Sequence, residues 1–182
     1  LSRSRACRQS LVPDPESWVI YIPFDTADFR LGGSLLSQAA GIGGVPADIS
    51  DADCFIDCFE VVREFVEDGL LLSGESVGEG GLLTTLDKMT SEECGLEADI
   101  SALMHSYQEK HSLRPLFSEV PGVIVQIRDS DFDYLDAELL LQDVAYFPLG
   151  HPSAEVHGVE VKCSEKSGIQ TILESLMRNA EG

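Results

Sequence analysis

The order of apolar and polar positions divides the chain into interleaved strands and helices. Alternation with a period of two, or a short apolar run between turn residues, indicates a strand, whereas apolar residues three to four apart indicate a helix. These criteria predict strands over residues 18–24, 70–72, 94–100, 123–127 and 144–149, and a hairpin over 155–163 with its turn at His157-Gly158. They predict helices over residues 31–40, 51–68, 82–89, 101–120 (two pieces broken near Pro115), 129–142 and after Ser167.

The longest predicted helix, residues 51–68, carries an apolar stripe at helical spacing. Ser50 is expected to cap its N-terminus, with Asp53 in the capping-box position. Gly69 is expected to end it as the left-handed residue that follows many helices. We interpret the stripe as core; it comprises Phe55, Ile56, Phe59, Val62, Phe65 and Val66.

The mixture of elements predicts an α+β fold, a mixed β-sheet packed with helices. The strands alternate with helices, but the expected hairpin near the end requires some antiparallel pairing. A chain of 182 residues fits one domain with a real core, which we place at residues 18–182. Residues 1–17 contain Pro13 and Pro15 and are expected to be a leader or linker. Because the chain lacks an initiator Met and a secretory signal, we expect it to be a piece of a longer protein.

Residues 69–89 form the stretch around which the chain is organised. The apolar run Leu70–Leu72 ends in a small polar loop, residues 73–81, which opens a helix with Leu82, Leu83, Leu86 and Met89 on one face. A strand–loop–helix junction offers free backbone N–H groups and the positive end of a helix dipole, which suit phosphates and carboxylates. Its glycines lack a Cβ, so that a ligand or another backbone can approach closely. The alternative is an ordinary turn, since glycine-rich motifs often match by chance.

Charge excludes two classes of partner. The formal net charge is −20 and the pI is about 4.3, whereas nucleic acids and anionic membranes require surfaces rich in Lys and Arg. A local basic pocket built from a few of the twelve Lys and Arg residues is still compatible with this composition. No apolar run approaches the ~20 residues that span a bilayer.

The five cysteines do not form a metal-binding pattern. They include no CxxC pair and no Cys/His cluster of zinc spacing, so we expect small core residues or exposed thiols. Such usage is typical of a reducing compartment, and we expect a cytoplasmic protein.

Six sequence pieces occur together in an order that resembles a known family. They are RLGGSLLSQ (30–38), DGLLLSG (68–74), GEGGLLTTLDKM (78–89), CGLEADIS (94–101), LFSEVPGVIVQI (116–127) and YFPLG (146–150). The set resembles the C-terminal-type domain of the aminoimidazole-ribotide synthetase superfamily. More closely, it is similar to the second such domain of the phosphoribosylformylglycinamidine synthases. The resemblance covers about residues 19–150.

The resemblance implies a share in a larger enzyme. Such synthases convert formylglycinamide ribonucleotide (FGAR), ATP and glutamine into formylglycinamidine ribonucleotide, ADP, phosphate and glutamate. ATP and Mg²⁺ are held mostly by a preceding N-terminal-type domain, and ammonia comes from a separate glutaminase domain; neither lies in this sequence. The piece is then expected to line one wall of a nucleotide or substrate cleft and to have no turnover alone. Its partners would be the rest of the parent polypeptide, with a homodimer possible for the isolated piece.

The resemblance also implies the candidate ligand-binding residues. They lie in a first glycine loop (Arg30–Ser34) and in a second glycine loop (Ser73–Gly81). The candidates are Arg30, Gly32, Gly33, Ser34, Glu75, Ser76, Glu79, Gly80 and Gly81. For the first loop the alternative is ordinary helix capping. No catalytic residue and no metal ligand is expected, and Cys94 lacks the partners that a glutaminase nucleophile needs.

Two departures from the family pattern leave another function open. Glu75-Ser76 stands where the family has His-Asp, and Glu79-Gly80-Gly81 stands where it has Asp-Gly-Gly. The alternative is a non-catalytic scaffold or interaction domain of a degenerate homologue. Another relative with the same fold, such as aminoimidazole-ribotide synthetase, a hydrogenase maturation factor or selenophosphate synthetase, is a third possibility.

Overall fold

The fold contains two β-sheets. The computed structural model describes residues 7–25, 29–41, 43 and 49–163. Its strands are β1 (Ser17–Pro23), β2 (Leu71–Ser76), β3 (Gly95–Asp99), β4 (Gly122–Arg128), β5 (Phe147–Gly150), β6 (Pro152–Ser153) and β7 (Val159–Lys162). A four-stranded sheet has the order β2-β4-β1-β5 with every neighbouring pair antiparallel. A three-stranded sheet has the order β6-β3-β7, in which β6 is antiparallel and β7 parallel to β3.

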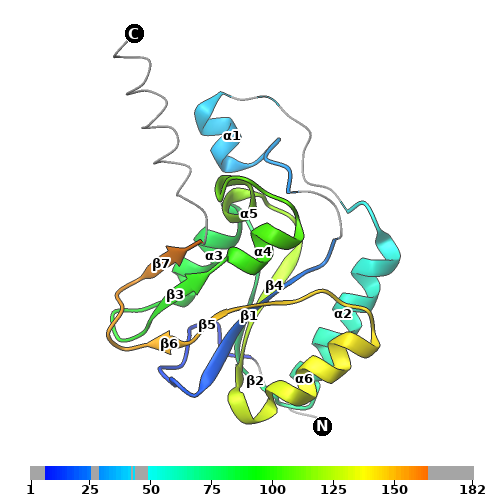
Figure 1. Cartoon of the computed structure of the whole chain (residues 1–182), viewed down its shortest axis with the longest axis vertical. Coiled ribbons are helices and arrows are strands. Elements are labelled where there is room, and N and C mark those ends of the chain that lie inside the picture. The colour runs from blue at the N-terminus through cyan, green and yellow to red at the C-terminus, as the bar shows by residue number, and fades with distance from the viewer. Residues whose placement is uncertain (1–6, 26–28, 42, 44–48, 164–182) are drawn as a thin grey trace.

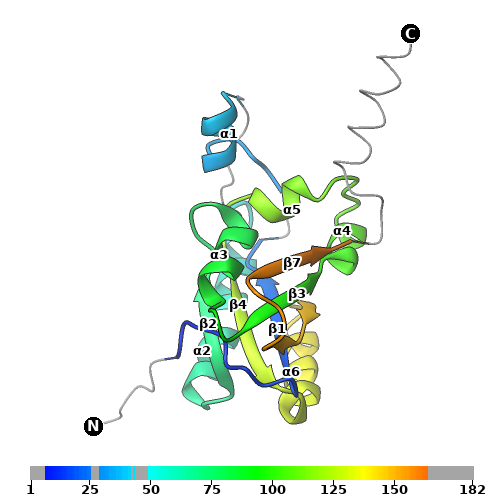
Figure 2. The same ribbon diagram turned by 90° about the vertical axis from the view of Figure 1, so that its left-hand side faces the viewer.

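Helices lie on both faces of the larger sheet. They are α1 (Leu35–Ala40), α2 (Ala52–Glu67), α3 (Gly81–Met89), α4 (Ser101–Ser106), α5 (Leu113–Phe117) and α6 (Asp129–Leu141). α2 and α6 share one hydrophobic cluster with the larger sheet, while α3, α4 and the smaller sheet share the other. α1 projects from the body (Figures 1 and 2). The molecule therefore has the mixed α+β fold that the sequence predicts.

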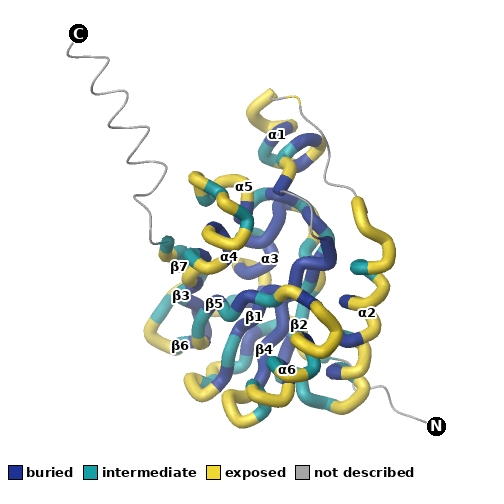
Figure 3. The backbone as a smooth tube through the Cα atoms, turned by 45° about the vertical axis from the view of Figure 1, so that its right-hand side comes forward, coloured by how far each residue is buried: buried dark blue, intermediate teal, exposed yellow. Residues whose placement is uncertain are grey.

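The two central strands are apolar on both sides because both faces of the sheet are covered. In β1, Val19 and Tyr21 face the cluster with α3, and Ile20 and Ile22 face the cluster with α2 and α6. All four residues are at most 1% exposed. Figure 3 shows β1 and β4 buried in the middle of the molecule. The strands predicted at 18–24 and 123–127 are therefore confirmed.

The segment before β1 packs against the folded domain. Leu11 is 2% exposed, and its N–H donates to the carbonyl of Met89 at 2.8 Å. The Gly74 N–H on the outer edge of β2 donates to the carbonyl of Arg8, also at 2.8 Å. Figure 2 shows this segment, in dark blue, crossing beside β2. Residues 8–16 thus contact the domain directly, and the division of the chain at residue 17 stays a prediction.

A buried glutamine attaches this segment to the sheet. Gln126 of β4 is fully buried, and its Oε1 accepts hydrogen bonds from the Val12 N–H (2.8 Å) and the Ser73 hydroxyl (2.9 Å). Its Nε2 donates to the Val12 carbonyl and to the Ser17 hydroxyl, both at 2.8 Å. Both ends of the amide are satisfied, which is what allows a polar side chain inside a strand of the core.

The ends of α2 follow the expected chemistry, with a shift of one residue at the start. Asp51, and not Ser50, is the cap, and its side chain accepts from the N–H groups of Asp53 and Cys54. The Ser50 hydroxyl instead donates to the buried carboxylate of Asp25. After the helix, Gly69 has φ 70°, so the predicted left-handed terminator is confirmed.

The interpretation of the α2 stripe as core was wrong for part of its residues. The buried positions are Cys58, Val61 and Phe65, whereas Phe59 is 52% and Ile56 53% exposed. The helix packs on the sheet through the neighbouring row of Cys58, Val61 and Phe65. A groove of about 530 Å³ remains open between α2 and the edge strand β2. Several stripe residues line this groove, namely Phe55, Phe59, Val62 and Val66.

Further differences concern short elements. β6 and β7 do not form the predicted hairpin, since they flank β3 on opposite sides. Pro115 lies inside α5, where a proline in the first turn costs no hydrogen bond, and the break falls at residues 107–112. α1 begins only at Leu35, which is 47% exposed. The helix expected after Ser167 lies outside the described residues.

We expect Gln126→Leu to lower the free energy of unfolding by about 2–4 kcal/mol, because it leaves both backbone groups of Val12 without their buried partner. Urea unfolding measures this change. Gln142→Leu, at an exposed position after α6, is the control and should change stability by less than about 0.5 kcal/mol. Equal effects of the two substitutions would contradict the role given to the buried amide.

Candidate functional site

The first glycine loop caps α1 with its own side chain. Ser34 is the N-cap; its hydroxyl donates to the Leu31 carbonyl (2.5 Å) and accepts from the Ser37 N–H (3.2 Å). Gly33 adopts φ 75°, a left-handed turn conformation that favours glycine. The capping interpretation therefore accounts for Ser34, whose hydroxyl is already engaged on both sides.

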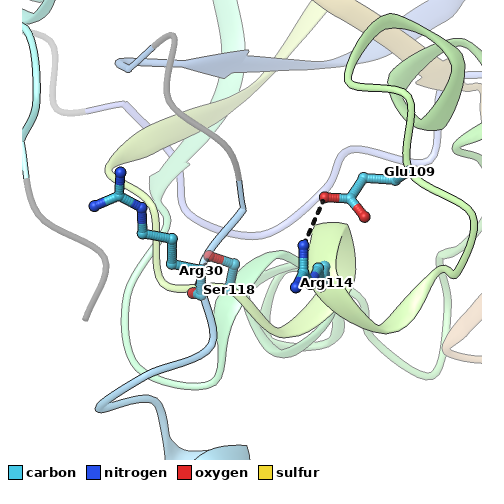
Figure 4. Close-up of polar contacts among 4 residues, drawn as sticks. All are labelled: Arg30, Glu109, Arg114 and Ser118. Carbon is cyan, nitrogen blue, oxygen red and sulfur yellow. Dashed lines mark hydrogen bonds and ion pairs between the residues drawn. The ribbon is translucent and has the colours of Figure 1, made fainter. Parts of the chain in front are cut away.

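Arg30 is held in this loop through its backbone. Its carbonyl accepts a hydrogen bond from the Ser118 hydroxyl at 2.6 Å, and its side chain is exposed. Figure 4 shows Arg30 beside Ser118, with the guanidinium extended away from the backbone. Arg30 is thus available to a ligand, whereas Gly32 is buried beside it.

Four residues predicted in the second glycine loop, Ser73 to Ser76, lie in a strand instead. Glu75 and Ser76 are the last residues of β2, and the loop proper begins at Val77. The Glu75 carboxylate accepts a hydrogen bond from the Ser76 N–H at 2.9 Å. Both residues line the groove beside α2, and none of the other seven predicted residues lines that groove. The prediction placed them in the loop because Ser73 and Gly74 look like turn residues, but pairing with β4 extends the strand through them.

The glycines at the start of α3 serve close packing. Gly80 and Gly81 have φ 86° and 77°, which few other residues adopt. A Cβ on Gly81 would lie 2.8 Å from the carbonyl oxygens of Leu116 and Ser118, and one on Gly80 would collide with the side chain of Thr84. Of the two guests considered for these glycines, the structure places another backbone, that of α5, against Gly81.

One carboxylate joins the two glycine loops. Oε1 of Glu119 accepts hydrogen bonds from the Gly80 N–H at 2.9 Å and from the Leu35 N–H at 3.0 Å. These amides begin α3 and α1, so a negative charge sits where two helices begin, as helix dipoles favour. Glu79, by contrast, is exposed and makes no hydrogen bond or ion pair with the described residues.

The sequence thus predicted anion-binding loops, but it did not reveal the internal anion. Glu119 lies in the piece LFSEVPG, which is part of the family resemblance. The available signal was a carboxylate flanked by Ser118 and Val120 just before a Pro-Gly turn, a position that packing would fix. The structure therefore brings the first loop and the end of the second loop together through Glu119.

Burial makes the thiols of the described core poor nucleophiles. Cys58 and Cys94 are each 1% exposed; desolvation raises the pKa of the Cys58 thiol to about 12 and also raises the pKa of Cys94. A thiol with a raised pKa supplies little thiolate at neutral pH. Among residues 7–25, 29–41, 43 and 49–163, no group of three His, Cys, Asp or Glu side chains could hold a metal ion. No helix in these ranges is both long and apolar enough to cross a bilayer.

Comparison with known proteins identifies the relationship. No family model matches the chain. Human phosphoribosylformylglycinamidine synthase is 28% identical to it over 151 residues, which is 79% of this chain and 11% of the human protein. The chain is homologous to a segment of phosphoribosylformylglycinamidine synthase. It spans only about a tenth of the length of this curated relative, consistent with a domain of a larger protein.

Solved structures of bacterial PurL proteins share the fold. PurL from Thermotoga maritima complexed with FGAR has a TM-score of 0.66 and 15% identity, over 86% of this chain and 27% of that one. The same protein complexed with AMPPCP has a TM-score of 0.65 and 14% identity, over 86% and 24% of the two chains. T. maritima phosphoribosylformylglycinamidine synthase II gives 0.63 and 15%, over 87% and 25%. The resemblance and the fold class inferred from the sequence are confirmed.

We expect Glu119→Ala to release the two glycine loops from each other. It should lower the free energy of unfolding by about 1–2 kcal/mol, the cost of two N–H groups that lose a charged acceptor. Hydrogen exchange at the Leu35 and Gly80 amides should accelerate, whereas Glu119→Gln, which keeps an oxygen acceptor, should change both quantities less. Glu92→Ala, at an exposed site, is the control. Unchanged exchange at both amides in Glu119→Ala would refute the bridge.

Two substitutions within the second loop test whether its glycines are needed for close packing. Gly81→Ala should lower stability by about 2–4 kcal/mol, since its Cβ would meet the backbone at the end of α5 and its φ is left-handed. A Cβ at Gly78 would meet nothing within 4 Å, so we expect Gly78→Ala to be neutral or stabilising by up to about 1 kcal/mol. Urea unfolding of both variants checks the contrast, and similar values would exclude the packing explanation.

Proposed function

We propose that this chain is the second C-terminal-type domain of a phosphoribosylformylglycinamidine synthase and works as part of a longer polypeptide. The observation that carries the proposal is homology over 79% of the chain to a segment that makes up 11% of the human enzyme. The parent would convert FGAR, ATP and glutamine into formylglycinamidine ribonucleotide, ADP, phosphate and glutamate in the cytoplasm. Its partners are the other domains of that polypeptide.

Within the parent, this domain lines one wall of a nucleotide or substrate cleft and has no turnover alone. Structures of T. maritima PurL have been determined with FGAR, ATP and AMPPCP, so ligands of both kinds bind to that protein. In this chain the two glycine loops meet at one end of the domain, where Arg30 is exposed beside them. ATP and Mg²⁺ would be held mainly by the preceding domain of the parent.

A specific observation favours a second candidate, a non-catalytic scaffold. The amides of Leu35 and Gly80 are already engaged by Glu119, and the space at Gly81 is filled by the backbone at the end of α5. Glu75-Ser76 also departs from the His-Asp of the family and sits on an edge strand. A domain whose glycine loops are satisfied internally can contribute shape and contacts without touching nucleotide.

Turnover of the polypeptide that contains this chain decides between the two candidates. ADP release that depends on FGAR, with glutamine or ammonium as the nitrogen source, is expected from the native protein. The same assay on Glu75→His/Ser76→Asp tests the departure, and the variant should differ little if β2 stands outside the cleft. Rescue of an inactive native protein by this double change would mean that the β2 end is catalytic and has decayed. Absence of turnover from both folded proteins would establish the scaffold.

A further inference from the structure

We propose that a surface pocket next to the first glycine loop binds the phosphate group of a small phosphorylated molecule through Lys110 and Arg114. The inference rests on the proposed function, because it specifies which side chains of this domain hold a phosphate. It differs from the prediction made from the glycine loops, whose amides are engaged elsewhere.

The pocket lies between the chain segment that links α4 to α5 and the first glycine loop. Its volume is about 490 Å³, within the range of small-molecule sites. Leu31 from the glycine loop and Leu113 from α5 supply apolar walls. Its charged and ring-nitrogen groups are Glu109, Lys110, His111 and Arg114.

This pocket is unusual for its charge. The chain carries 32 Asp and Glu against 12 Lys and Arg, yet two cations and an imidazole gather here around one carboxylate. Three other pockets along the described residues hold at most one Lys or Arg each. The cation of the pocket beside β3 and β7, Lys162, is ion-paired with Glu97. Of these four pockets, only the one near the first glycine loop has an excess of positive charge.

The two cations are available to a ligand. Lys110 is exposed and has no ion pair or hydrogen bond with the described residues. Arg114 approaches Glu109 only to 3.8 Å, which is longer than a hydrogen bond, and its side chain is 58% exposed against 11% for Glu109. The carboxylate thus lies inward and orients the guanidinium, whose N–H groups can still bind a phosphate in the bidentate manner typical of Arg.

The surroundings restrict the ligand further. Figure 4 shows the Arg30 guanidinium pointing away from the Glu109–Arg114 pair, so Arg30 is not part of this pocket. Leu31 and Leu113 offer apolar contact to the body of the ligand beside the phosphate. A nucleoside monophosphate has the matching chemistry, since its phosphate is dianionic and the faces of its planar base can make apolar contact.

Calorimetric titration of the 182-residue chain tests the site with AMP, inorganic phosphate and adenosine at low ionic strength. We expect AMP to bind, phosphate to compete with it, and adenosine to bind at least about tenfold more weakly than AMP, a loss equivalent to one charge-assisted contact. Arg114→Gln and Lys110→Gln should each weaken AMP binding by about tenfold. Arg128→Gln is the matched control, since Arg128 is similarly exposed (52%) and ion-paired with Asp131 but lies outside the pocket.

Urea unfolding of each variant ensures that only folded proteins are compared. AMP affinity that is equal in Arg114→Gln, Lys110→Gln and the native chain would overturn the site. A loss in Arg128→Gln as large as in Arg114→Gln would also overturn it, since the binding would then follow total charge. Absence of AMP binding at millimolar concentration has the same consequence. None of these results touches FGAR-dependent turnover, so the failure of the pocket and the failure of the synthase proposal are distinguishable.

Discussion

Burial of both faces of the four-stranded sheet is the constraint on which the rest of the structure depends. A sheet that is apolar on both sides must be covered twice, by α2 and α6 on one face and by α3, α4 and the smaller sheet on the other. Gln126 is the polar exception in the central strand β4, and its amide fastens the segment before β1 across the sheet. This double cover also fixes where the loops emerge, and so brings the starts of α1 and α3 to one end of the domain.

At that end, backbone amides that could bind an external anion are already hydrogen-bonded to a carboxylate of the chain itself. Glu119 occupies the place where the amides of two helix starts converge, and Gly81 packs against the backbone at the end of α5. Glycine-rich loops of a kind typical of phosphate sites thus serve here to pack helices against one another. Exposed positive charge lies in and next to them, on Arg30 of the first loop and on Lys110 and Arg114. The Lys110 and Arg114 side chains make one long ion pair, between Arg114 and Glu109, with the described residues.

Sequence patterns predicted the elements whose signals are local. The alternation of Leu96, Ala98 and Ile100 predicted a strand that the structure has at Gly95–Asp99, and all three side chains are buried. The glycine after α2 ended that helix as expected. Patterns failed where the answer depends on distant partners. The row of α2 that faces the sheet, the pairing of β6 and β7 with β3, and the bridge from Glu119 to Leu35 and Gly80 are contacts between residues far apart in the chain. Spacing along one segment contains no information about them.

The most direct measurement is a two-dimensional NMR titration of the 182-residue chain with AMP, following each backbone amide. The account predicts shifts of the amides of residues 108–114 that saturate with AMP concentration, while the amides of Leu35 and Gly80 keep their positions because Glu119 still accepts from them. Saturating shifts at Leu35 and Gly80, with residues 108–114 unchanged, would contradict it. That result would mean that phosphate displaces Glu119 and that the glycine loops themselves are the anion site.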